Sequence, residues 1–272
     1  MTAATARESV NIVIGGTGIE VISGDAGFLE MLHRQYADFV ARDACPSIRL
    51  EIDVTAGPEA ADAVDDDAEL RVRREGNCWN LSRGDFEARY DPGIRRGVVR
   101  QSANRHSIDS VIRIIHTLTL ANDCGFLLHS ASAIRNGRAF LFAGRSGAGK
   151  TTLSRHVPPD ACLLSDEVSY VRKSGAEFQA WGTPFTGELG TPGANRAAPI
   201  EALCFLRQAA ENRLVAIGEP EALQLLLTNV LFFAHDAELV ARVFDSAGEF
   251  VARTKAFRLE FTPGDRAWEL VR

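Results

Sequence analysis

Residues 141–171 of this chain read LFAGRSGAGKTTLSRHVPPDACLLSDEVSYV, and this stretch decides the fold that the sequence predicts. An apolar strand leads into residues 144–151, which match the pattern G-x-x-x-x-G-K-[ST] of a phosphate-binding loop in full. Glycines let the backbone wrap with its N–H groups pointing inward, and the start of the following helix adds a positive dipole end. The nucleotide contacts expected from this pattern are Gly144, Arg145, Ser146, Gly147, Ala148, Gly149, Lys150, Thr151 and Thr152.

Two residues of this glycine-rich loop have a defined chemical role in the pattern. Lys150 is expected to reach the β- and γ-phosphates of a nucleotide, and the Thr151 hydroxyl can ligate Mg²⁺. The alternative is a chance glycine-rich turn. The strand before the loop and the helix after it favour the phosphate-binding interpretation, because the pattern requires that context.

An acidic pair follows the loop at a short distance. The consecutive prolines after the loop helix limit that helix to about two turns, since proline cannot continue a helix. The next segment, ACLLS, is expected to be a short buried strand that ends at Asp166 and Glu167. Only sixteen positions separate Lys150 from Asp166, so the strands before and after the loop helix should be close neighbours with ends on the same side. We therefore expect the Asp166 carboxylate to face the γ-phosphate.

The two carboxylates of this pair suit two tasks. One can help to hold Mg²⁺, and the other can take the proton from an incoming hydroxyl group. The residues alone do not say which acid does which. The alternative is an ordinary acidic turn after a strand.

Other charged residues offer further contacts. Glu188 is the only acid of the irregular segment GTPFTGELG, where it is either a second carboxylate near Mg²⁺ or an exposed loop residue. Arg145 and Arg196 are candidates to balance charge on a transferred phosphoryl group, with a solvated arginine as the alternative.

The first third of the chain predicts a small mixed α/β unit. VNIVIGGTGIEVISG reads as a hairpin around Gly15 and Gly16. DAGFLEMLHRQYADFVA has apolar residues at helical spacing, with Asp25 as the N-cap. Strands are expected at SIRLEIDV, ELRVRRE, NCWNLSRG and DFEARYD.

The remainder of the chain predicts the larger unit. SIDSVIRIIHTLTLAND is expected to be a helix that starts at Ser107 or Asp109. FLLHSASAI and RAFLFAG read as strands joined by a tight turn, IEALCFLRQ as a later strand, and EPEALQLLLTNVLFFA as an apolar helix. We expect a small N-terminal α/β unit at residues 1–100 and a catalytic domain at residues 101–272.

Composition excludes some function classes. The 272 residues carry a formal net charge of −6, which argues against a nucleic-acid-binding surface built from excess Lys and Arg. No apolar run approaches the roughly 20 residues that span a bilayer. The N-terminal sequence MTAATARESVNIVI lacks the apolar core of a secretory signal, so a cytoplasmic location without a membrane partner is expected.

The segments LLHSASAI, GRAFLFAGRSGAGKTTLSRHV and LLSDEVSYV together resemble the catalytic domain of HPr kinase/phosphorylase. They are more similar still to its shorter relatives, the HPr-kinase-related serine kinases, whose core is shared with phosphoenolpyruvate carboxykinase. The resemblance extends over residues 126–173 and becomes loose beyond them. It implies a P-loop kinase domain of the HPr kinase/PEP carboxykinase type behind a smaller N-terminal mixed α/β unit, with ATP and Mg²⁺ as cofactors.

The resemblance also implies roles for individual residues. His129 matches a histidine that lies two strands upstream of the loop in that family, where it could donate to a phosphate oxygen or orient Asp166. A hydrogen-bonded core histidine is the alternative. Asp166 matches the base and Glu167 a metal-side ligand, with Glu here in place of the family's second Asp. The relatives further imply a peptide or protein acceptor with a serine, and a homo-oligomer.

Two departures from the family narrow the activity. The downstream glycine-rich signature that the bifunctional enzyme uses for phosphorolysis is not found, and WGTPFTGELGTPG stands in its place. The chain also looks too short for a carboxykinase and lacks the additional metal-binding histidine and lysine pattern. The resemblance therefore implies a kinase without phosphorylase activity.

The sequence as a whole predicts an ATP- and Mg²⁺-dependent kinase that phosphorylates a serine hydroxyl of a peptide, protein or small acceptor. The predicted catalytic residues are Asp166, His129 and Lys150, and the predicted metal ligands are Thr151, Glu167 and Glu188. The rival prediction is a nucleotide-binding regulatory or sensor protein with slow ATP hydrolysis. A kinase needs a base that faces an acceptor cleft, whereas a switch needs a water-positioning group. The role of Asp166, as a base or not, therefore distinguishes the two predictions.

Overall fold

The computed structural model describes residues 7–41, 44–55, 69–262 and 264–271. Their contacts divide the chain into two compact units. Unit 1 comprises Met1–Thr119 with Phe233–Asp236, and unit 2 comprises Leu120–Phe232 with Ala237–Arg272. The chain is a mixed α/β protein with one sheet in each unit and few helices. The sequence-based domain boundary at residue 100 stays a prediction.

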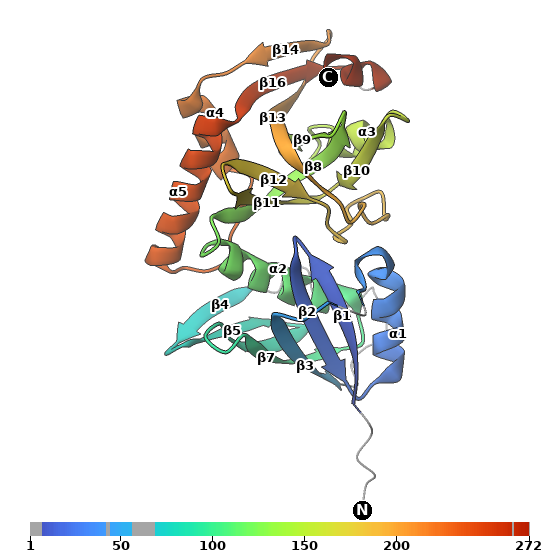
Figure 1. Ribbon diagram of the computed structural model, residues 1–272, viewed down its shortest axis with the longest axis vertical. Coiled ribbons are helices and arrows are strands. Elements are labelled where there is room, and N and C mark those ends of the chain that lie inside the picture. Colours follow the sequence, from blue (N-terminus) through green and yellow to red (C-terminus); the bar gives the residue numbers. More distant parts are fainter. Residues whose placement is uncertain (1–6, 42–43, 56–68, 263, 272) are drawn as a thin grey trace, which may run out of the picture. The chain divides into compact units, whose positions relative to one another are not determined.

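Unit 1 is built on a seven-stranded sheet (Figure 1). Its strands are β1 (Glu8–Ile14), β2 (Thr17–Ser23), β3 (Ile48–Thr55), β4 (Arg71–Glu75), β5 (Cys78–Arg83), β6 (Phe86–Asp91) and β7 (Arg96–Ser102), in the order β1-β2-β3-β7-β6-β5-β4. β3 is parallel to β2 and β7, and the other neighbours are antiparallel. Buried and exposed side chains alternate in β6, as expected for a sheet with one covered face. The predicted strands are confirmed, and β7 is an addition.

The predicted hairpin and first helix are also confirmed. β1 and β2 pair around Gly15 and Gly16, which both have positive φ. α1 (Ala26–Gln35) starts after Asp25, whose carboxylate accepts the Phe28 N–H at 2.8 Å. A short 3-10 helix, η1 (Ala37–Phe39), follows. Local capping chemistry therefore suffices to define this end of the unit.

The second helix starts earlier than the sequence indicated. α2 (Arg105–Leu120) begins two positions before Ser107, because the Asn104 side chain accepts the Ser107 N–H at 2.9 Å and serves as the cap. The Ser107 hydroxyl instead donates to Asp85 at 2.7 Å. The assignment of Ser107 or Asp109 as the start was therefore wrong.

Unit 2 contains a nine-stranded sheet. Its strands are β8 (Gly125–Arg135), β9 (Arg138–Ala143), β10 (Ala161–Ser165), β11 (Val168–Ser174), β12 (Glu177–Trp181), β13 (Ala197–Gln208), β14 (Arg213–Ala216), β15 (Val230–Leu231) and β16 (Lys255–Phe261). Its helices are α3 (Lys150–Arg155), α4 (Glu219–Leu227), α5 (Ala237–Arg253) and the 3-10 helix η3 (Asp265–Leu270).

Strand β8 organises this sheet. Its first half pairs with β11 and β15, and its second half pairs with β9 on one side and β10 on the other. The turn to β9 has positive φ at Asn136 and Gly137, the conformation that a two-residue hairpin of this sequence adopts. β9 and β10 are both antiparallel to β8, so they run in the same direction. Their ends lie on one side as predicted, with β8 between them.

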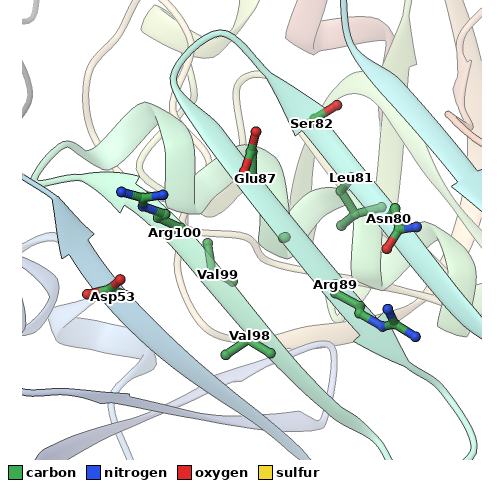
Figure 2. A pocket seen from close by; sticks show the side chains of 10 residues that line it. Asp53, Asn80, Leu81, Ser82, Glu87, Arg89, Val98, Val99 and Arg100 are labelled. Atoms are coloured by element: carbon green, nitrogen blue, oxygen red, sulfur yellow. The ribbon is translucent and has the colours of Figure 1, made fainter.

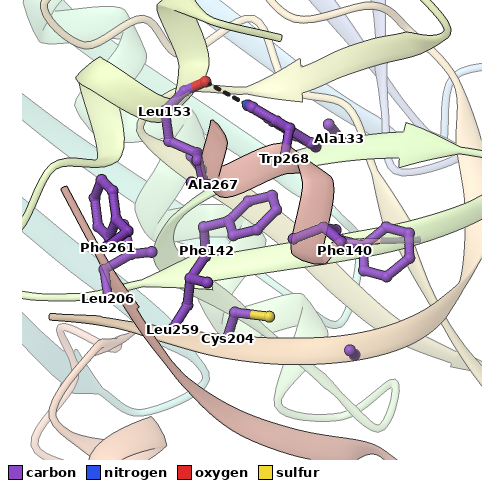
Figure 3. Packing of buried hydrophobic residues seen from close by; sticks show 13 residues of the cluster. Ala133, Phe140, Phe142, Leu153, Cys204, Leu206, Leu259, Phe261, Ala267 and Trp268 are labelled. Carbon is purple, nitrogen blue, oxygen red and sulfur yellow. Dashed lines mark hydrogen bonds between the residues drawn. The ribbon is translucent and has the colours of Figure 1, made fainter. Parts of the chain in front are cut away.

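A buried apolar cluster supports the end of β9 and the helix α3 (Figure 3). Phe142 and Trp268 pack edge to face, with ring centroids 5.2 Å apart. The Trp268 indole N–H also donates to the Leu153 carbonyl at 3.0 Å, which connects η3 to α3. Phe261, at the end of β16, belongs to the same cluster. Phe261 and Trp268 thus pack against the end of β9 and helix α3, which come from the middle of the sequence.

The C-terminal helices differ from the prediction. The helix expected to run to residue 234 ends at Leu227, and β15 then pairs with β8. α5 was not predicted, although Leu239, Val243, Ala247 and Phe250 are buried at helical spacing. In the described ranges, no helix combines the length and the apolar character that crossing a bilayer requires.

Candidate functional site

The glycine-rich loop lies between β9 and α3, as the sequence predicted. Gly147 and Gly149 have φ values of 77° and 109°, which side chains other than glycine rarely adopt. A Cβ atom at Gly149 would lie 2.5 Å from Cζ of Phe261. Glycine is therefore required at this position both for its conformation and for its contact with the core.

The side chain of Lys150 lies along the loop. Its ammonium group donates to the carbonyl oxygens of Gly144 at 2.7 Å and Arg145 at 3.4 Å, and the residue is buried. Burial lowers the pKa of Lys150, while the charges of Glu167 and Glu188 act in the opposite direction. The ammonium group is thus partly desolvated, and both carboxylates are close enough to stabilise its charged form.

The acidic pair sits in the tight turn between β10 and β11. The Ser165 hydroxyl accepts the N–H groups of Glu167 at 3.1 Å and Val168 at 2.9 Å, which fixes the backbone of the turn. The Glu167 carbonyl in turn accepts the Ser130 N–H of β8 at 3.1 Å. The side chains of Asp166 and Glu167 consequently enter different surroundings.

Asp166 is buried, with 3% of its surface exposed. One carboxylate oxygen accepts the Gly187 N–H at 3.0 Å, and the other accepts the Leu189 N–H at 3.1 Å. This arrangement differs from the expectation that the carboxylate faces a phosphate, because both oxygens are bonded to the backbone of the segment after β12. Its role as a base stays a prediction.

Glu167 lies beside His129, with 3.4 Å between Oε1 of the acid and Nδ1 of the imidazole. Both side chains are about one-third exposed, at 31% and 28%. The His129 backbone N–H donates to the Asn229 carbonyl at 2.8 Å, which holds this part of β8 against the residues before β15. The histidine therefore lies next to the second acid of the pair, whereas the sequence resemblance implied that it orients Asp166 or donates to a phosphate oxygen.

A cavity of about 440 Å³ collects most of the predicted site residues. Its described lining consists of His129, Ser146, Gly147, Gly149, Lys150, Thr151, Thr152, Glu167, Gly187, Glu188 and Gln208. Gly144, Arg145, Ala148 and Asp166 were predicted to contact the ligand but are not among these described lining residues. Arg145 and Arg196 are exposed.

Two of the lining residues were missed by sequence reasoning. Gln208, at the end of β13, donates through its side-chain amide to the Gly147 carbonyl at 2.9 Å. It could have been found, because it ends a predicted strand of the same sheet. Gly187 has no signal in a single sequence, since its place depends on how the segment after β12 folds back.

The cavity residues fit a phosphate-bearing ligand. A volume of this size lies within the usual range for small-molecule sites, roughly 300–1,000 Å³. A buried ammonium group, three hydroxyl side chains and the glycine backbone are the groups that phosphate oxygens require. For Mg²⁺, the available ligands are Thr151, Glu167 and Glu188, although the described residues contain no ready-made group of three or more His, Cys, Asp or Glu for a metal. A bound phosphate would have to complete such a coordination shell.

A second hollow, of about 430 Å³, lies on the sheet of unit 1. Figure 2 shows Asp53, Arg100 and Glu87 projecting from the neighbouring strands β3, β7 and β6. The three residues are opposite one another in register, so charges alternate across the strands as on an ordinary solvated sheet face. The cavity of unit 2 is therefore the stronger candidate for a ligand site.

Fold and site together define a mixed α/β protein with a glycine-rich loop at one cavity of its second sheet. A family model described as SynChlorMet cassette protein ScmC matches residues 99–271, which is more than half of the chain, and the chain belongs to this family. No curated protein matches the sequence. The Hpr(Ser) kinase/phosphatase from Coxiella burnetii is a similar solved structure, 9% identical, with 53% of this chain and 90% of that chain covered at a TM-score of 0.30.

Proposed function

We propose that the chain is an ATP- and Mg²⁺-dependent kinase that transfers the γ-phosphoryl group to a serine hydroxyl of a peptide, protein or small acceptor. The observation that carries this proposal is the cavity itself. It brings Lys150, the glycine-rich loop and the hydroxyl of Thr151 together with two carboxylates, Glu167 and Glu188. This combination of one cation, backbone donors and acids suits a nucleotide that binds with a divalent metal.

Each residue of the cavity has a task in this proposal. Lys150 would exchange its bonds to the loop carbonyls for phosphate oxygens, and Thr151, Glu167 and Glu188 would hold Mg²⁺. When bound, ATP with Mg²⁺ supplies the transferable phosphoryl group and neutralises charge on it. Gln208 holds the Gly147 carbonyl and so preserves the shape of the loop.

Proton removal from the acceptor hydroxyl requires a carboxylate. The sequence resemblance assigns this task to Asp166, while Glu167 is the acid of the pair that lines the cavity. His129 lies next to Glu167, where it can orient that carboxylate or donate to a phosphate oxygen. The proposal as a kinase needs one such base; if Glu167 is that base, Thr151 and Glu188 remain to hold Mg²⁺.

The experiment combines binding and transfer. ATP is titrated calorimetrically into the full chain with Mg²⁺, and a library of serine-containing peptides is then assayed for phosphoserine. Binding with transfer is the expected result. Binding with slow ADP release but no transfer to the peptides or to a panel of small hydroxyl acceptors would favour a sensor, and no binding would reject the proposal.

The direction of the reaction is part of the proposal. Phosphorolysis would require inorganic phosphate to attack the phosphoserine, which gives pyrophosphate and free serine. The segment that stands in place of the family's phosphorolysis signature, residues 181–193, supports a kinase without this reverse activity. Phosphorylated acceptor, enzyme, Mg²⁺ and excess phosphate should therefore yield no pyrophosphate. Enzyme-dependent pyrophosphate would contradict the one-way reaction.

A further inference from the structure

The segment between β12 and β13, residues 182–196, is irregular and is attached to the rest of unit 2 near both of its ends. At the near end, the Thr183 N–H donates to the Leu164 carbonyl at 3.1 Å. At the far end, the Ala194 N–H donates to the Leu163 carbonyl at 3.0 Å. Both attachments are to β10, the strand that leads into the acidic pair. The ends are therefore fixed by backbone bonds of the ordinary kind.

The middle of this segment is bound differently. Gly187 and Leu189 donate their N–H groups to the two oxygens of a single buried carboxylate, that of Asp166. Bonds to an ionised acceptor are roughly twice as strong as neutral ones. A buried carboxylate also needs such donors, because an unsatisfied buried charge is costly. The contact thus stabilises the acid and fixes the segment together.

The packing at Gly187 shows how close this approach is. A Cβ atom there would lie 2.8 Å from Oε2 of Glu167 and 3.1 Å from Oδ2 of Asp166. A side chain at this position would require the carboxylate of Glu167 to shift. The next residue, Glu188, is exposed and lines the cavity.

We propose that Asp166 is a positioning residue, which anchors residues 187–189 and thereby places Glu188 at the cavity. The inference rests on the proposed function only for what Glu188 does there. It gives the adjacent acids separate tasks: Asp166 binds the segment, whereas Glu167 faces the ligand. It also moves Asp166 out of the group that contacts the reactants.

The first test needs no ligand. Hydrogen exchange of the backbone amides is measured by NMR in the wild-type chain, in Asp166→Asn and in Glu167→Gln. In the wild type, the Gly187 and Leu189 amides should exchange more slowly than the Glu188 amide. In Asp166→Asn, at least one of the two should exchange about tenfold faster or more, because the carboxamide offers one acceptor and loses the charge. Glu167→Gln is the matched control and should leave both amides unchanged.

Two results would overturn the proposal. One is a wild-type chain in which the Gly187 and Leu189 amides exchange as fast as Glu188, which can be measured even when a variant does not fold. The other is equal protection of both amides in Asp166→Asn and in the wild type. Either result would mean that the carboxylate does not anchor the segment.

The second test separates positioning from proton transfer. If Asp166 acts through Glu188, Asp166→Asn should raise the KM for Mg·ATP about as much as Glu188→Gln does, and the double variant should add little to either. Loss of a proton acceptor would instead lower kcat at unchanged KM, and that outcome would overturn the proposal. A wild-type chain that binds no Mg·ATP would reject the proposed function, while the exchange experiment would still decide the role of Asp166.

Discussion

Two clusters of charged residues differ in their surroundings: one is buried among protein groups, and the other lies at a cavity. In unit 1, Asp109 of α2 is buried between the helices, where its carboxylate accepts the Tyr36 hydroxyl and the Gln35 amide, the latter at 3.0 Å. Burial raises the pKa values of Asp109 and of Tyr36. In unit 2, Lys150 donates to the loop carbonyls, and Glu167 and Glu188 stay partly or fully exposed at a cavity.

The difference separates structural from functional polarity. The carboxylate of Asp109 accepts its hydrogen bonds from protein groups and holds α1 to α2. The cavity brings an ammonium group and two carboxylates together beside open space, an arrangement typical of a ligand site. Substitutions should therefore affect stability in the first cluster and binding in the second.

The largest expected effect concerns Lys150. Replacement by alanine should abolish phosphoryl transfer and weaken ATP binding roughly 10- to 100-fold, since a hydrogen bond to a charged group contributes about 1.5–3 kcal/mol. Thermal stability should change little. Calorimetric ATP titration and a thermal melt measure both. Lys173→Ala, which removes a partly exposed ion pair with Glu249, is the control and should leave ATP affinity intact. Equal ATP affinity of Lys150→Ala and the wild type would contradict the site.

The second prediction concerns the cluster of unit 1. Asp109→Ala leaves the buried Tyr36 hydroxyl and the Gln35 amide without this acceptor, and we expect a loss of about 3 kcal/mol in the free energy of unfolding. Urea denaturation measures it. Asp53→Ala, at an exposed position of β3, should cost less than about 0.5 kcal/mol. If the two variants unfold alike, the cluster does not stabilise unit 1.

A smaller effect is expected for the glycine of the loop that contacts the core. Gly149→Ala combines an unfavourable φ with a clash against Phe261, and should destabilise the chain by about 1–3 kcal/mol and weaken ATP binding. Gly76→Ala is a matched control, because Gly76 also has a positive φ, 60°, but a Cβ there would meet no atom within 4 Å. The difference between the two variants measures the contact with Phe261 together with the larger backbone strain at a φ of 109°. No difference in stability would mean that Phe261 does not support the loop.

The smallest effect is a pH dependence in unit 1. Burial alone would raise the pKa of Asp85, but hydrogen bonds from Arg83 and Ser107 and the arginine charge outweigh it, so the pKa of Asp85 is lowered. A lowered carboxylate pKa stabilises the fold above the unfolded-state value, about 3.9, and this stabilisation is lost as the pH falls through the folded-state value. Asp85→Asn should therefore be less stable than the wild type at pH 6, and the gap should close in acid. A difference in the free energy of unfolding that stays constant between pH 6 and pH 2.5 would show that the ionised form of Asp85 does not stabilise the fold.

Local patterns predicted a large part of this structure. The hairpin at Gly15 and Gly16, the N-cap at Asp25 and the short loop helix each depend on neighbouring residues, and all three are confirmed. α2 was misplaced because Asn104 competed with Ser107 for the same capping position. Helix α5 was not predicted, although its apolar residues stand at helical spacing in the sequence.

The sequence predicted the part of the site that comes from neighbouring residues, but not the contacts that distant residues make with it. The loop and Glu167 come from one continuous stretch, and the structure places them at one cavity. The orientation of Asp166 depends on Gly187 and Leu189, which lie more than twenty positions away and join it through backbone N–H groups. Backbone donors leave no mark on residue type, so no pattern in one sequence could have revealed this contact.

The contact between Gly149 and Phe261 has a consequence for how the chain is made. A ribosome releases the glycine-rich loop more than a hundred residues before it releases the aromatic ring that supports it. During that interval the loop has been synthesised, but Phe261 is not yet present to pack against it, and β16 has not yet paired with β13. If the loop binds nucleotide as proposed, binding should thus begin only after β16 has been synthesised and has paired with β13. A chain that stops short of Phe261 would not compete for ATP with one that contains it.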